Sequence, residues 1–144
     1  MLSKEKYAKM LEKLFCKTKA QELSWLTLPE YLEEKRNDEL RRYIINNHKY
    51  FYDSRPKDDR KYLKESKCVC TEVLNGLVLI FLYEECKGHS HTDMYSLAIQ
   101  SKIGGVVEEL QFGDFQEELE KLYKISGAIG MDAEMFVDLI IDDL

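Results

Sequence analysis

The sequence predicts an α+β protein in which helices precede and follow a central four-stranded antiparallel sheet. Residues 67–85 contain two runs of β-branched and aromatic side chains around Asn75-Gly76, the dipeptide most typical of a β-hairpin. Apolar residues recur at helical spacing on both sides of this stretch. With 144 residues, 44% of them hydrophobic and only 2 prolines, the chain is expected to form one domain over residues 1–144.

Helices are predicted for the N-terminal third. Ser3 is a suitable N-cap residue, and apolar side chains from Tyr7 to Phe15 fall at i, i+3, i+4, i+7 and i+8, along one helix face. Residues 27–30 have the Thr-x-x-Glu spacing of a capping box with a proline in the first turn, which predicts a second helical region with a break near Asn37. The polar stretch 53–61 predicts a loop.

The central hairpin has a predicted register. A two-residue I′ turn at Asn75-Gly76 requires a positive φ at both residues, which asparagine and glycine tolerate best. This turn would place Leu74 opposite Leu77 and Cys70 opposite Phe81. The strand that follows the turn is apolar on both faces, as is typical of a central strand covered on each side.

Two further strands complete the predicted sheet. A polar connection over residues 86–93 leads to a third strand at 95–100, where apolar and polar side chains alternate. The glycine pair at 104–105 predicts a turn, and residues 106–110 predict the fourth strand. Short connections make an antiparallel meander the simplest topology.

Two C-terminal helices are predicted. Asp114 and Asp132 are the expected N-caps, and Gly127 is the expected stop of the first helix. Asp142 and Asp143 lie at the negative end of the last helix, which disfavours anions, so a cation from the chain or from a partner would stabilise them. The apolar residues of the last helix are Phe136, Val137, Leu139, Ile140, Ile141 and Leu144.

Neither a targeting segment nor a membrane span is predicted. The N-terminus is charged from Lys4 onward and lacks the apolar segment of a signal peptide. The longest apolar run, residues 77–83, is too short to cross a bilayer as a helix. We therefore expect a cytoplasmic protein with no membrane partner, in which four cysteines are reduced thiols: Cys16, Cys68, Cys70 and Cys86.

Charge is unevenly distributed along the chain. Residues 1–64 hold 16 Lys/Arg and 11 Asp/Glu, a net charge of +5, whereas residues 65–144 hold 5 and 16, a net charge of −11. One interpretation is a dipolar molecule whose acidic end suits a basic partner. The alternative is that the two halves fold against each other and neutralise locally.

Thiols and imidazoles provide one candidate metal site. Cys86, His89 and His91 follow one another at a spacing that a loop could wrap around zinc. Cys68 and Cys70 lie about 7 Å apart on one face of a strand, and we expect reduced core residues there. The alternative to a metal is that the histidines are solvated loop residues, and the sequence predicts no cofactor.

Basic and aromatic residues are interleaved in the segment 41–62, as in surfaces that bind nucleic acid. The alternative is an amphipathic helix with its aromatic side chains in the core, followed by a charged loop. The net charge of −6 favours this alternative, so nucleic acid is not the expected partner. The residues concerned are Arg41, Arg42, Tyr43, Lys49, Tyr50, Tyr52, Arg55, Lys57, Arg60, Lys61 and Tyr62.

No catalytic motif is present in the sequence. It has no nucleophile elbow, no Gly-rich phosphate loop and no H-E-x-x-H segment. Glu108 and Glu109 are neighbours in a predicted strand, so their side chains point to opposite faces and cannot act as a pair. A non-enzymatic protein is therefore expected.

An acidic interaction surface is the remaining candidate site. Such a surface supports fast association with a basic protein. The alternative is a solvated face that keeps the protein soluble. The candidate protein-binding residues are Glu84, Glu85, Glu108, Glu109, Asp138, Asp142 and Asp143.

Several stretches form a distinctive layout: N-G-L-V-L-I-F-L-Y from Asn75, L-A-I-Q-S from Leu97, V-V-E-E-L from Val106 and the closing F-V-D-L-I-I-D-D-L, with Trp25 and Tyr50–Tyr52 upstream. Together they resemble a group of small uncharacterised bacterial proteins of the immunity-like or mobile-element accessory kind. The resemblance is one of layout over most of the chain and carries no catalytic residue. It implies a protein that binds another protein.

The sequence thus predicts a non-enzymatic inhibitor, immunity- or antitoxin-like, whose acidic C-terminal half covers a basic site on a partner protein such as a toxin or nuclease. Two alternatives remain open. One is a small metal-dependent hydrolase or nuclease that uses Cys86, His89 and His91. The other is a nucleic-acid adaptor that uses the segment 41–62. The oligomeric state is left open.

Overall fold

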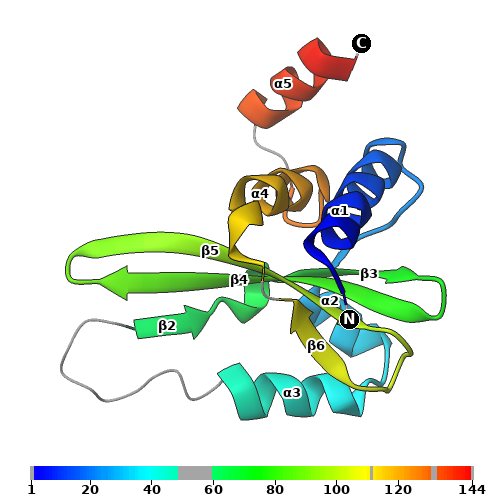
Figure 1. The fold of residues 1–144 in the computed structure, drawn as a ribbon, viewed down its shortest axis with the longest axis vertical. Coiled ribbons are helices and arrows are strands. Elements are labelled where there is room, and N and C mark those ends of the chain that lie inside the picture. Colours follow the sequence, from blue (N-terminus) through cyan, green and yellow to red (C-terminus); the bar gives the residue numbers. More distant parts are fainter. Residues whose placement is uncertain (1, 49–59, 111, 131–132, 144) are drawn as a thin grey trace.

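An antiparallel sheet forms the middle layer of the fold, with helices on both faces (Figure 1). The computed structural model describes residues 2–48, 60–110, 112–130 and 133–143. Within these ranges the side chains of Asn47, His48, Arg60, Lys87, Met135, Leu139 and Asp143 lie outside the description. Helices and an antiparallel sheet together confirm the predicted α+β class.

The helices of the described chain are α1 (Lys4–Lys19), α2 (Leu28–Glu34), α3 (Asp38–His48), α4 (Gln116–Ile125) and α5 (Ala133–Asp143). The strands are β1 (Leu26–Thr27), β2 (Arg60–Leu63), β3 (Val69–Val73), β4 (Gly76–Lys87), β5 (Ser90–Gln100) and β6 (Val107–Leu110). Two short 3₁₀ turns, η1 (Glu65–Lys67) and η2 (Gly113–Phe115), complete the description.

The predicted count of four strands is wrong. The sheet has the order β1-β3-β4-β5-β6, and β2 pairs with β4 beside the end of β3. The two additional strands, β1 and β2, come from the N-terminal half and are only two and four residues long. Segments this short show no clear alternation, and they become strands because an existing edge offers them backbone partners.

The central hairpin forms, but its turn lies one residue earlier than predicted. Val73 pairs with Gly76, so the turn residues are Leu74 and Asn75, and only Leu74 has a positive φ, of 57°. Cys70 consequently lies opposite Leu79. Each β3 residue therefore pairs with a β4 residue two positions earlier than predicted. Because two is an even number, every side chain keeps its predicted face.

Close backbone contact explains the position of Gly76. A Cβ atom on this residue would lie 2.5 Å from the carbonyl oxygen of Gln100 and 2.9 Å from that of Ser101. Gly76 is therefore required by the chain that leaves β5, and not by the φ angle of the turn.

The predicted polar connection 86–93 is also wrong, because both strands continue through it. Cys86 pairs with His91 and Lys87 with Ser90, and Gly88 and His89 form the turn. Gly88 supplies the positive φ, of 59°. Backbone pairing with a neighbouring strand needs no apolar side chains, so a polar sequence can extend the hairpin beyond the covered part of the sheet.

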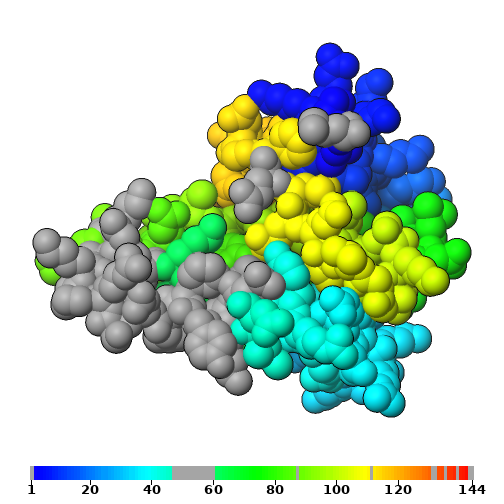
Figure 2. Space-filling view, turned by 60° about the horizontal axis from the view of Figure 1, so that its bottom comes forward, coloured from blue at the N-terminus to red at the C-terminus, as the bar shows by residue number. Residues whose placement is uncertain are grey.

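Two hydrophobic cores lie on opposite faces of the sheet. On one face, α2 and α3 cover Leu77, Leu79, Phe81 and Tyr83 of β4. On the other, α1 and α4 cover its alternate residues, among them Val78 and Ile80. The prediction that β4 is apolar on both faces is confirmed, because each face has its own helical layer. Figure 2 shows α2 and α3, in cyan, beside β6, in yellow.

Helix ends agree with the sequence in three places and differ in one. Ser3 caps α1 by accepting a hydrogen bond from the backbone of Lys6, and Thr27 and Glu30 form the predicted capping box. Gly127 has the positive φ of a helix stop. Asp114 does not cap α4, which begins at residue 116, because its carboxylate instead forms an ion pair with Lys4 at 2.5 Å. The predicted cap at residue 132 lies outside the described residues.

The basic and acidic halves of the chain pack against each other. Helix α1 lies on α4, and β2 pairs with β4, so N-terminal elements contact C-terminal ones throughout the sheet. Ion pairs such as Lys4–Asp114 and Lys64–Asp93 join the two halves. These contacts favour local neutralisation of charge in the body of the fold, from which α5 is set apart.

Candidate functional site

The C-terminal helix α5 stands apart from the rest of the fold (Figure 1). Its exposed apolar side chains are Phe136, Val137, Ile140 and Ile141, with 58%, 49%, 41% and 70% of their surface accessible. Together with Leu74 at a hairpin turn, they account for most of the strongly exposed large apolar residues described. None of the described helices has the length and apolar character needed to cross a bilayer.

Acidic side chains flank the apolar face of α5. At about 100° per residue, the four exposed apolar residues cover a continuous face about 140° wide. Glu134, Asp138 and Asp142, each four residues apart, form a stripe along one side of that face. Among the side chains that the structure describes, these three carboxylates form no ion pair, and α5 contains no lysine or arginine.

The structure does not bring all the predicted acidic residues together. Glu84 and Glu85 point to opposite faces of β4, as do Glu108 and Glu109 on β6. The two pairs are separated along β5 by six residues, about 20 Å. The side chain of the third predicted aspartate of α5, at residue 143, lies outside the described residues.

Glu109 has a structural partner. Its carboxylate accepts a hydrogen bond from the hydroxyl of Tyr83, a residue buried in the α2–α3 core. Burial, and then this carboxylate, raise the pKa of Tyr83 far above its ordinary value. Tyr83 therefore stays protonated and donates this hydrogen bond at any physiological pH.

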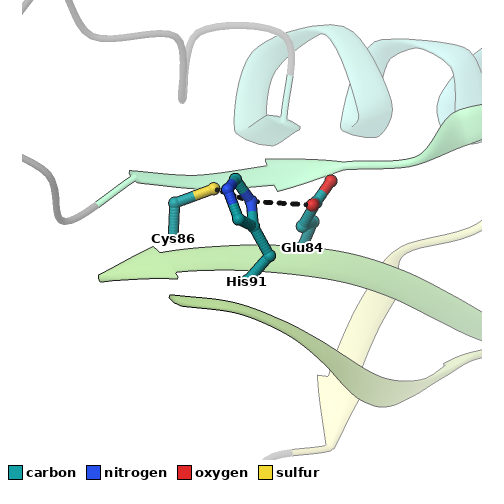
Figure 3. Close-up of side chains that lie close together, drawn as sticks. All are labelled: Glu84, Cys86 and His91. Carbon is teal, nitrogen blue, oxygen red and sulfur yellow. Dashed lines mark hydrogen bonds and ion pairs between the residues drawn. The ribbon is translucent and has the colours of Figure 1, made fainter. Parts of the chain in front are cut away.

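A second group of side chains gathers at the far end of the β4–β5 hairpin (Figure 3). Its β4 members, Glu84 and Cys86, alternate in step with Val78 and Ile80 and so lie on the α1–α4 face. His91 Nδ1 lies 3.2 Å from Cys86 Sγ and 3.0 Å from Glu84 Oε1, and the three ligand atoms lie within 4.8 Å of one another. A hydrogen bond from the Tyr62 hydroxyl, and then the charge of Lys64, lower the pKa of Glu84. Glu84 is thus a carboxylate at neutral pH.

Two of the three predicted metal ligands belong to this group. Cys86 and His91 lie directly opposite each other across the ladder, whereas His89 occupies the turn and is not part of the group. Glu84, which the sequence placed on an acidic surface, takes the third position. The signal that could have found it is its i, i+2 spacing from Cys86, which puts both side chains on one face of a strand.

The described residues of the basic, tyrosine-rich segment form contacts with other residues of the chain. Arg41 donates to the carbonyl of Leu32 at 2.5 Å, and Arg42 pairs with Glu39. The ring of Tyr43 stacks on Phe81, and the ammonium of Lys61 lies 4.5 Å from the ring centre of Tyr83. These contacts favour the amphipathic-helix interpretation. The candidates between residues 49 and 59, and the side chain of residue 60, lie outside the described residues.

Cys68 and Cys70 are buried in the α2–α3 core, as predicted. Burial raises the pKa of each thiol to about 12. Both residues are therefore neutral core side chains and not metal ligands.

The buried thiols predict that stability falls in alkaline solution. Between about pH 9 and 12 an unfolded chain loses the thiol protons while the native chain keeps them, so the free energy of unfolding decreases as pH rises. Each thiol should contribute about 1.4 kcal/mol per pH unit in this window. Urea unfolding at pH 8, 9, 10 and 11 measures the slope. It should be shallower in Cys68→Ala/Cys70→Ala and unchanged in Cys16→Ser, an exposed cysteine; an unchanged slope in the double variant would contradict the assignment.

Neither a protein-family model, nor a curated protein, nor a solved structure matches the chain. Two local features are therefore the basis for a functional proposal: the apolar and acidic helix α5, and the Glu84–Cys86–His91 group. Sequence reasoning identified the acids of α5 but not the exposure of its apolar residues, because a helical pattern alone does not reveal whether another element covers that face.

Proposed function

We propose that the protein is a non-enzymatic protein-binding module, and that α5 is the element that docks on its partner. The observation that carries the proposal is the exposure of Phe136, Val137, Ile140 and Ile141 on one face of a helix that none of the other described elements covers. An amphipathic helix of this kind binds by laying its apolar face into a hydrophobic groove. Exposed apolar patches on soluble proteins mark such interaction sites.

The charge of α5 defines the chemistry of the partner. The helix has four acidic residues and no basic one, and its C-terminal acids lie at the end of the helix dipole that disfavours anions. An apolar groove rimmed by lysine and arginine would satisfy both the apolar face and these carboxylates. The partner is therefore a basic protein.

Binding would also stabilise the helix itself. An isolated helix of 11 residues is marginal in water, because few backbone hydrogen bonds repay the cost of nucleation. Contact with a groove supplies the apolar burial that the other described elements do not provide. A helix that completes its stability on a partner suits an immunity- or antitoxin-like inhibitor that occludes a basic site on a toxin or nuclease.

The proposal predicts separate kinetic effects for the two kinds of side chain on α5. Tagged protein expressed at native level in its host should retain one stoichiometric basic partner, which is then purified for surface plasmon resonance. Phe136→Ala/Ile140→Ala should weaken binding by about 100-fold through faster dissociation, because each is an apolar anchor. Asp138→Asn/Asp142→Asn/Asp143→Asn should instead lower the association rate and flatten its dependence on salt.

A matched charge variant makes this experiment specific to α5. Glu72→Gln/Glu108→Gln/Glu117→Gln removes three exposed acids from the body of the fold and should leave both rate constants nearly unchanged. If this control slows association as much as the α5 variant does, the binding surface is the body and not α5.

Self-association is the outcome that would overturn the basic-partner proposal. A groove of about 390 Å³ lies between α1 and α4, lined in part by Leu11, Phe15 and Phe115, and could receive α5 of a second copy. Light scattering that detects a homodimer, together with dissociation of that dimer by Phe136→Ala/Ile140→Ala, would assign α5 to a self-interface. A monomer that retains no basic partner would exclude both functions of α5.

A further inference from the structure

We propose that Glu84, Cys86 and His91 form a Zn²⁺-binding site at the far end of the β4–β5 hairpin, with three protein ligands and the remaining coordination open to water. The inference does not depend on the proposed function of α5. It rests on the identity, placement and mutual geometry of three side chains (Figure 3).

The ladder between β4 and β5 holds the three ligands in place. Cys86 and His91 are paired directly across the two strands, where Cβ atoms lie about 5 Å apart. Glu84 is two residues before Cys86, so its side chain points to the same face. The ladder runs without a break from the pair 77–100 to the pair 87–90, so the ligand positions are set by backbone hydrogen bonds and a two-residue turn, and not by a long loop.

The distances between ligand atoms are close to those that zinc needs. Tetrahedral Zn²⁺ with sulfur at about 2.3 Å and nitrogen and oxygen at about 2.0–2.1 Å requires ligand atoms about 3.3–3.6 Å apart. His91 Nδ1 lies 3.2 Å from the Cys86 sulfur and 3.0 Å from a Glu84 oxygen. Rotations of the half-buried Glu84 and Cys86 side chains and of the exposed His91 side chain would adjust these two distances by a few tenths of an ångström. They would also bring the Cys86 sulfur and the Glu84 oxygen, which lie within 4.8 Å of each other, into the same range.

A shared nitrogen distinguishes this group from a catalytic cysteine–histidine–acid triad. In a triad the acid and the nucleophile contact different ring nitrogens, so that one orients the imidazole while the other exchanges a proton. Here the thiol of Cys86 and the carboxylate of Glu84 both face Nδ1 of His91. One proton on Nδ1 can serve only one of them, whereas a cation placed between them contacts all three.

Neighbouring residues support a cation at this position. The Tyr62 hydroxyl donates to the second oxygen of Glu84, which leaves the first oxygen directed at His91. Hydrogen bonds of this kind orient metal ligands. The ammonium of Lys64 forms an ion pair with Asp93 at 3.0 Å, so this carboxylate partly offsets its charge near the site.

The set of ligand atoms selects the metal. Thiolate sulfur and imidazole nitrogen favour zinc and similar transition ions, whereas Mg²⁺ and Ca²⁺ prefer oxygen ligands only. A thiolate and a carboxylate together neutralise the two charges of Zn²⁺.

The test is metal binding by the full-length, fully reduced protein. Zn²⁺ is titrated in competition with a chromophoric chelator, and Co²⁺ is used as a spectroscopic probe of sulfur ligation. We expect one Zn²⁺ per chain, a thiolate-to-cobalt charge-transfer band, and no binding of Mg²⁺. Cys86→Ser and His91→Ala should abolish the stoichiometric site and the band, Glu84→Gln should weaken binding, and Tyr62→Phe should weaken it by about tenfold.

Two matched controls exclude adventitious binding. Cys16→Ser removes an exposed thiol outside the group, and His89→Asn removes the imidazole of the turn; both variants should bind zinc as the wild type does. Circular dichroism of each metal-free variant verifies that it is folded. Absence of a stoichiometric site in the wild type, or full binding by Cys86→Ser, would overturn the proposal. Loss of binding in His89→Asn would contradict the proposed ligand set and identify His89, and not Glu84, as the third ligand.

Discussion

Replacing Asn37 by alanine should lower the free energy of unfolding by about 3 kcal/mol, because one buried amide has two structural roles. Its Oδ1 atom accepts a hydrogen bond from the backbone of Leu40 and so caps α3. Its side chain also forms a reciprocal pair of hydrogen bonds with Gln100, at 2.7 and 3.1 Å. Asn37 is 1% exposed and Gln100 0%, so water cannot replace the lost partner.

The N-cap of α1, Ser3, is a reference that separates the capping contribution of Asn37 from the contribution of its buried amide pair. Ser3→Ala removes the cap of α1, which is exposed, and should cost only about 1 kcal/mol. Urea unfolding measures the loss of stability in Asn37→Ala and in Ser3→Ala. The difference between the two losses is the contribution of the buried amide pair. In a double-mutant cycle with Gln100→Ala, we expect a coupling energy of about 1–3 kcal/mol. Additive effects would mean that the amide pair does not stabilise the fold.

Replacing Gly76 by alanine should destabilise the protein by about 2–4 kcal/mol. The new methyl group would lie 2.5 Å from the backbone oxygen of Gln100 and 2.9 Å from that of Ser101. These are main-chain atoms, so they cannot rotate away as the end of a side chain can. Relief therefore requires displacement of the end of β5 from the start of β4. Thermal and urea unfolding both measure the loss.

Gly113→Ala is the matched control for this prediction. No atom lies within 4 Å of a Cβ built there, and its φ is not in the left-handed region. The substitution should therefore leave stability within about 1 kcal/mol or raise it slightly, since alanine reduces the freedom of the unfolded chain. Equal effects at the two positions would show that general loss of glycine, and not the backbone contact, destabilises the sheet.

Local patterns in the sequence determined most of the helices and the central hairpin. Serine and the Thr-x-x-Glu spacing define the starts of α1 and α2 because an N-cap needs only a side-chain oxygen near its own backbone. The unbroken run of apolar residues over 77–83 required a covered face on each side of β4, and the two cores lie there. The sequence also grouped Cys86, His89 and His91 as candidate metal ligands in one short segment, which it predicted to be a loop.

Contacts between distant segments decided the remaining features. Strands β1 and β2 exist because β3 and β4 offer free edges, and Asp114 forms an ion pair with Lys4 because α1 packs on η2 and α4. Gly76 is a strand residue and not a turn residue because the backbone after β5 approaches it.

For the two candidate sites, too, the sequence specified one part and the tertiary structure the other. The sequence alone specified an apolar and acidic last helix, and it specified a cysteine and histidine near one hairpin. Only the tertiary structure decided that the apolar face of α5 is left exposed by the other elements in the described ranges, and that Glu84 joins Cys86 and His91. The physical reason is that exposure and ligand geometry depend on the elements that pack around a residue, whereas caps and amphipathic faces depend on its neighbours in the chain.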